Sequence, residues 1–130
     1  MNTKKFEEAL HQLLELDPRY PEQAYILIRE ALDFTIKTLN KPVEGDARHI
    51  SATELMEGIR QFVLQEYGPM TKTILNEWGI YSSEDFGEIV FNLVAKGILG
   101  KTEKDRKEDF MQGYDFNEAF SEPFRPHSVH

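Results

Sequence analysis

The sequence predicts a mainly helical α+β protein, in which an N-terminal helical hairpin precedes a three-helix unit that carries a short β-hairpin. Three observations predict this class: two helix starts share one capping pattern, apolar residues recur at helical spacing in five segments, and the period changes after Gly97. With 130 residues in the chain, we expect a single domain over 1–130, because neither part is large enough to bury a core alone.

The helical hairpin is predicted over residues 3–39. Leucines and a phenylalanine recur on one side of residues 3–16, which indicates an amphipathic helix. Pro18 and Pro21 then disfavour helical geometry in the residues before them. From residue 22 onward, apolar side chains occupy more than one face, as is typical of a helix that is covered on several sides. We therefore expect the second helix to be central, between the first helix and the three-helix unit.

A polar loop is predicted over residues 40–50, and the three-helix unit begins after it. Ser51 and Glu54 have the spacing of a capping box, in which each side chain accepts a hydrogen bond from the other residue's backbone N–H. Ser82 and Asp85 repeat this spacing, with the shorter aspartate as the partner. Two such signals predict helix starts at these positions.

The helix ends in this unit are marked by glycines. Gly68 can close one helix, and Pro69 can open the next because the first helical turn does not use its missing N–H. Gly79 is followed by isoleucine, a pattern typical of a left-handed glycine just past a helix end. Tyr81 is then expected to fold over Phe86 as a hydrophobic staple at the next helix start. The sequence thus predicts a tight corner between two helices.

Beyond the third helix of the unit, the pattern favours strands. Residues 98–102 form a short, partly apolar segment that could be a strand. Residues 103–108 are mostly charged, and residues 109–116 regain apolar character. A strand, a charged tip and a returning strand would form a wing, so residues 51–116 resemble a winged-helix or helix-turn-helix layout. The remaining residues, 117–130, have no regular period and are expected to form an extended tail.

Composition limits the classes of function. The chain contains no cysteine, which excludes disulfides and thiolate chemistry. Its first residues become charged where a signal peptide would be apolar, and its longest apolar runs are far too short for a membrane span. We therefore expect a cytoplasmic protein without membrane contact. The formal net charge of −8 disfavours binding to phosphate backbones, which lysine and arginine neutralise.

No arrangement typical of an enzyme is present. Of the four histidines, only His127 and His130 are close in sequence, and both belong to the terminal stretch. A phosphate-binding glycine-rich loop and a nucleophile elbow are both missing from the sequence. We interpret neighbouring acids such as Glu84 and Asp85 as helix-start charges, so we expect no catalytic residue, no cofactor and no metal.

Nucleic-acid binding is the alternative that a helix-turn-helix layout suggests. The third helix of the unit would then enter the major groove, but residues 83–97 contain three acids and one base. A surface of that sign repels phosphates. The alternative therefore depends on the basic residues of the predicted wing, which alternate with an equal number of acids: Lys101, Lys104, Arg106 and Lys107.

We interpret the chain as a small, acidic, non-enzymatic domain that associates with another protein or with a second copy of itself. Trp78 and Tyr81, at the predicted corner, are the candidate anchors because aromatic residues dominate interface energetics. Glu84 and Glu88 on the following helix would supply charge beside them. The competing interpretation is that both aromatic residues close the core at the corner.

Several stretches resemble a family of short uncharacterised bacterial proteins to which no activity is assigned. The resemblance covers most of the chain apart from its extreme ends, and it implies no catalytic residue, ligand or partner. The stretches that carry it are Arg19–Tyr25, Arg48–Ser51, Gly68–Met70, Glu77–Ile80, Ser83–Leu93 and Tyr114–Phe116.

Overall fold

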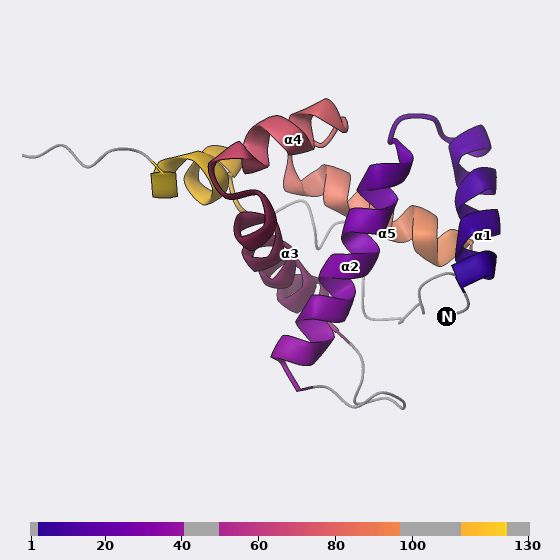
Figure 1. Ribbon diagram of the computed structural model, residues 1–130, viewed down its shortest axis with the longest axis horizontal. Coiled ribbons are helices and arrows are strands. Elements are labelled where there is room, and N and C mark those ends of the chain that lie inside the picture. Colours follow the sequence, from indigo (N-terminus) through magenta and orange to yellow (C-terminus); the bar gives the residue numbers. More distant parts are fainter. Residues whose placement is uncertain (1–2, 41–49, 97–112, 125–130) are drawn as a thin grey trace, which may run out of the picture.

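The computed structural model describes residues 3–40, 50–96 and 113–124. Within these ranges the chain forms α-helices and short helical turns and no strand (Figure 1). The α-helices are α1 (Thr3–Leu16), α2 (Glu22–Thr38), α3 (Ala52–Tyr67), α4 (Thr71–Glu77) and α5 (Ser83–Ala95). The short turns are the 3₁₀ turns η2 (Gly68–Met70) and η5 (Glu122–Phe124) and the π-helical turn η4 (Asn117–Ser121).

The predicted α+β class is wrong for the part of the chain that the structure describes. Residues 113–116 were expected to end the returning strand, but they form an irregular segment that leads into η4. Residues 117–124 were expected to be extended, and they are helical. The strand predicted over 98–102 and the charged tip lie outside the described residues. A winged-helix layout is therefore not supported.

Helix α2 is the centre of the molecule, as its apolar residues on several faces predicted. It packs against α1, α3 and α5, and in Figure 1 it crosses between α1 on one side and α3 on the other. Ala24, Tyr25, Ile28 and Ala31 are completely buried. Their spacing of i, i+1, i+4 and i+7 places them on one broad face of α2, and burial of this face joins the N-terminal helices to the rest of the core.

The corner between α4 and α5 is confirmed. Gly79 has a φ of 78°, and its N–H donates to the Asn76 carbonyl at 3.1 Å, while Ile80 N–H donates to the Leu75 carbonyl at 2.9 Å. These two bonds define a Schellman motif, whose apolar pair here consists of the fully buried Leu75 and Ile80. A Cβ at position 79 would also lie 3.1 Å from the Arg19 carbonyl oxygen. Glycine is therefore favoured at this position both by the positive φ of the turn and by the close approach of the Arg19 backbone.

Carboxylates cap the starts of α3 and α5, as predicted. Glu54 N–H donates to Ser51 Oγ and Ser51 N–H donates to Glu54 Oε1, both at 3.1 Å. At α5, Asp85 Oδ2 accepts from the N–H groups of Tyr81 and Ser82 at 2.8 and 3.2 Å. Tyr81 is 66% exposed, so most of this residue lies in solvent and not over Phe86 as the predicted staple required.

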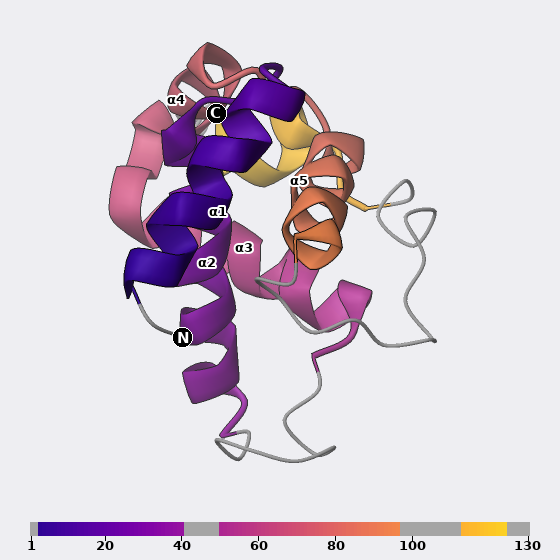
Figure 2. The same cartoon turned by 90° about the vertical axis from the view of Figure 1, so that its right-hand side faces the viewer.

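An aromatic group from the C-terminal segment completes the core. Phe116 and Phe120 are buried. Their ring centroids lie 4.9 Å apart, and Phe116 is 5.5 Å from Phe86 of α5. Tyr114 packs edge-on against Phe120, and its O–H donates to the Met56 carbonyl of α3 at 2.9 Å. The two views in Figures 1 and 2 place this segment beside α4 and α3, so it holds three helices together.

Candidate protein-interaction site

Four apolar side chains follow one another from the end of α3 along α4, and we call them the α4 ridge: Tyr67, Met70, Ile74 and Trp78. Met70 is 55% exposed, and the other three are half-buried. The rings of Tyr67 and Trp78 meet edge to face, with centroids 5.9 Å apart. Met70, Ile74 and Trp78 share one side of α4 because they are four residues apart, and Tyr67 at the end of α3 joins them through its ring contact with Trp78. It combines a fixed aromatic pair with a flexible, accessible thioether.

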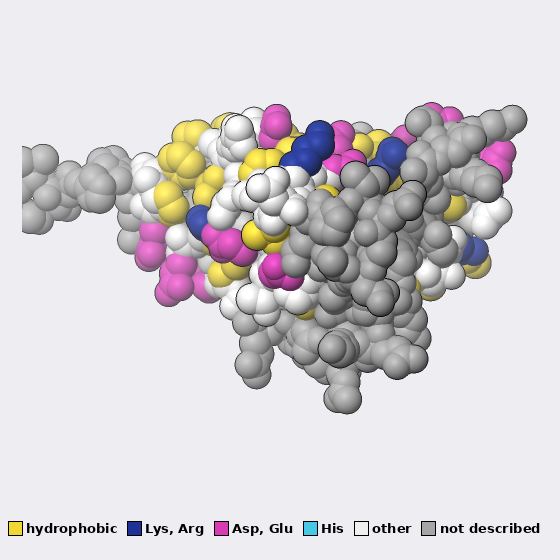
Figure 3. Space-filling view, turned by 90° about the horizontal axis from the view of Figure 1, so that it is seen from below, with side chains coloured by type: hydrophobic (Ala, Val, Ile, Leu, Met, Phe, Trp, Pro, Cys, Tyr) yellow, Lys and Arg dark blue, Asp and Glu magenta, His cyan; other side chains and the backbone are white. Residues whose placement is uncertain are grey.

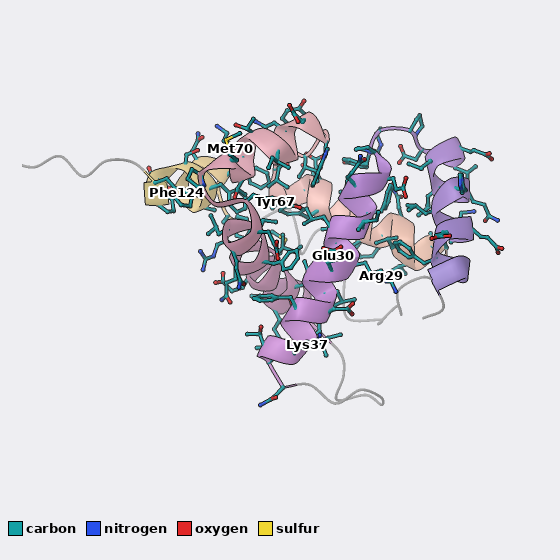
Figure 4. The ribbon with its side chains drawn as sticks, in the orientation of Figure 1. Arg29, Glu30, Lys37, Tyr67, Met70 and Phe124 are labelled. Atoms are coloured by element: carbon teal, nitrogen blue, oxygen red, sulfur yellow. The ribbon has the colours of Figure 1, made fainter. Side chains whose placement is uncertain are left out.

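Carboxylates lie beside the ridge. The pKa of Tyr67 is raised, first by burial and then by the negative charges of Glu30 on α2 and Glu66 on α3. In Figure 4, Tyr67 lies between α3 and the part of α2 that carries Glu30. Glu77, which precedes Trp78, is exposed. The ridge is therefore an apolar surface with an acidic surround.

The predicted anchor residues have different environments. Trp78 is half-buried and packs against the core, which fits the competing interpretation better than an exposed anchor. Tyr81, three residues further, is mostly in solvent. The structure therefore places the two on opposite sides of the Gly79 turn, one attached to the core and one accessible.

The predicted acidic face of α5 is largely engaged in contacts within the molecule. Glu84 is exposed. Glu88 lies 3.2 Å from the Arg19 guanidinium, and its side chain is 19% exposed. Asp85 Oδ1 accepts the hydroxyl hydrogen of Tyr20 at 2.6 Å, while its other oxygen caps the helix. Only Glu84 of these three acids is oriented as the prediction required.

These contacts belong to a polar network between the α1–α2 turn and α5. Arg19 Nη2 lies 2.7 Å from Asp17 Oδ2. Asn92 Nδ2 donates to the same Asp17 oxygen at 3.2 Å and to the Tyr25 hydroxyl at 3.1 Å. Hydrogen bonding from Arg19 lowers the pKa of Asp17 to about 2, against a usual value of 3.8. The network fixes two elements to each other, and no local pattern predicted it because Arg19 and Glu88 are 69 residues apart.

The remaining expectations concern nucleic-acid binding, metal binding and membrane spans. The basic residues Lys101, Lys104, Arg106 and Lys107 of the nucleic-acid alternative lie outside the described residues. Where the chain is described, no three histidine, aspartate or glutamate side chains are placed to hold a metal ion. None of the described helices has the length and apolarity needed to cross a bilayer.

The described residues thus define a class, a small all-helical domain with an apolar ridge along α4 and a polar network that joins the α1–α2 turn to α5. Comparisons with protein-family models, curated proteins and solved structures found no match to this chain. The surfaces themselves must therefore support any functional argument.

Proposed function

We propose that this protein is a non-enzymatic association domain that binds another protein through the α4 ridge. The exposure of Met70, three residues after Tyr67 of the Tyr67–Trp78 ring pair, carries this proposal. Aromatic residues and methionine are enriched in protein interfaces, and a methionine side chain adapts its shape to a partner surface. Ring pairs that are already ordered lose little conformational entropy when a partner binds.

Charge favours a basic partner over a second copy of the chain. Glu30, Glu66 and Glu77 surround or adjoin the ridge, and the formal net charge is −8. Two copies that met through this surface would bring like charges together, which costs free energy. A partner with an apolar strip between lysines or arginines would match both properties. The same acidity opposes binding to a phosphate backbone.

The ridge can be tested by capture from a cell lysate with matched variants. Met70→Ser removes the exposed thioether, whereas Leu16→Ser makes a similar change at a leucine of α1 that is 71% exposed. We expect one stoichiometric protein to be captured by the original chain and by Leu16→Ser. Met70→Ser should bind it at least about fivefold more weakly, as for a residue that contributes about 1 kcal/mol to an interface.

Two further measurements distinguish the alternatives. Sedimentation velocity of the protein alone should show a monomer, and a dimer that Met70→Ser dissociates would establish self-association in place of a basic partner. Titration into labelled duplex and single-stranded nucleic acid at low salt should show no binding. Equal capture by both serine variants would reject the ridge as the contact surface.

A further inference from the structure

A second feature is formed by α1 and the start of α2, and in Figure 1 α1 lies on the other side of α2 from α3. It is a hollow of about 320 Å³ between α1 and the start of α2. Its lining residues come from two turns of α1 and from the first residue of α2: Glu7, Glu8, Leu10, His11, Leu14 and Glu22. Neither the ridge nor the polar network includes any of them.

The lining combines apolar and negatively charged groups. Leu10 is buried and Leu14 is half-buried, so leucine side chains form the inner part of the hollow. Glu7, Glu8 and Glu22 are exposed and form its rim. None of the six lining residues is a lysine or an arginine. A ligand that suits this hollow has an apolar stem and a positive end.

The volume of the hollow and the placement of its polar side chains limit the kind of ligand that it can hold. A volume of about 320 Å³ is at the lower end of the range for small-ligand sites, which suits one long side chain. The described carboxylates and His11 are not grouped as metal ligands, so a bare cation does not fit. Lysine and arginine lay their aliphatic stems on apolar surface and keep the charged group at the edge.

We propose that this hollow receives one lysine or arginine side chain of a partner protein. A free amine would gain only the contacts inside the hollow, and it would lose its own translational freedom to obtain them. A side chain that belongs to a larger interface loses less translational freedom than a free amine does, because the rest of the partner already holds it in place. The proposal does not depend on the α4 ridge.

The test is an NMR titration of the whole ¹⁵N-labelled chain with three short peptides of the form acetyl-Gly-Gly-X-Leu-Gly-Gly-amide. With lysine at X, shift changes should be confined to α1 and the start of α2. With norleucine, which keeps the stem without the charge, binding should be at least about threefold weaker, as expected for loss of a weak exposed ion pair. With alanine, no shift changes are expected.

Two triple variants with the same change in net charge distinguish binding in the hollow from nonspecific attraction to an acidic protein. Neutralising the rim with Glu7→Gln, Glu8→Gln and Glu22→Gln should weaken lysine-peptide binding about tenfold. The control carries Asp33→Asn, Glu118→Gln and Glu122→Gln, three exposed acids elsewhere, and it should bind as the original chain does. Met70→Ser should also leave this binding unchanged, so failure of one proposal is distinguishable from failure of the other.

Three results would overturn the proposal. The first is an equal loss in both triple variants, which would indicate attraction by net charge alone. The second is binding of n-butylamine as tight as that of the lysine peptide, which would make the hollow a small-amine site. The third is a lysine-peptide titration without shift changes on α1. Circular dichroism of each variant confirms that the helices remain folded.

Discussion

At the scale of single residues, α2 and α3 come into very close contact in the core. Gly58 of α3 faces Thr35 of α2, and a Cβ at position 58 would lie 1.8 Å from Thr35 Oγ1. The Thr35 hydroxyl donates to the Ala31 carbonyl of its own helix at 2.7 Å, so this buried polar group is satisfied without α3. The contact therefore requires that position 58 have no side chain.

Gly58→Ala should lower the free energy of unfolding by about 1–3 kcal/mol, because the added methyl group overpacks the contact. This loss should exceed the gain of about 1 kcal/mol that alanine normally brings to a helix interior. Urea denaturation measures the difference. The double variant with Thr35→Ala should recover part of the loss, and an additive effect of the two substitutions would show that the two residues are not coupled.

At the scale of elements, the polar network makes the attachment of α5 to the α1–α2 turn dependent on pH. The pKa of Asp17 is lowered to about 2 by its hydrogen bonds from Arg19. A lowered pKa in the folded state means that the ionised carboxylate stabilises the fold above the usual value of 3.8, and that this contribution disappears as the pH falls toward 2.

Asp17→Asn should therefore be less stable than the original chain at pH 5, and the difference should shrink between pH 4 and pH 2. Since Arg19 is 55% exposed, solvent screens the pair, and we expect a difference of about 1 kcal/mol or less. Thermal unfolding across this pH range measures it. A difference that stays constant with pH would mean that the ionised state of Asp17 does not matter.

Element boundaries were predictable wherever the signal was local. The capping pair Ser51–Glu54 and the Gly79 turn depend on residues a few positions apart, and the structure has both. The strand over 109–116 was predicted from a short apolar run, and such a run does not distinguish strand from helix. Phe116 instead finds partners in Phe86 and Phe120, and these tertiary contacts decide its conformation.

At the scale of the whole molecule, the candidate site was only partly predictable. Trp78 was predicted as a candidate anchor, but Met70 and Ile74 were not. Helical spacing shows which side chains share a face, but another element must be present to cover that face, and the sequence does not say which element does so. Figure 3 shows the same mixture elsewhere, with hydrophobic and acidic side chains side by side at the end of the molecule near η5.

The core depends on the C-terminal aromatic group. Phe120 is 1% exposed and contacts the rings of Tyr114 and Phe116. Phe120→Ala should cost about 3–5 kcal/mol, through lost burial and the cavity that remains. Phe124→Ala, at a ring that is 42% exposed, is the control and should cost under about 1 kcal/mol. Urea denaturation compares the two, and equal losses would show that the segment does not close the core.

The order of synthesis gives this C-terminal segment a further role. Domains fold as the chain emerges, N-terminal parts first, and residues 113–124 emerge after every helix that they cover. A nascent chain that has been released only through α5 exposes Phe86 without its ring partner Phe116. We expect such a chain to expose apolar surface that is prone to aggregate, and its final folding step must wait until the last aromatic residues have left the ribosome.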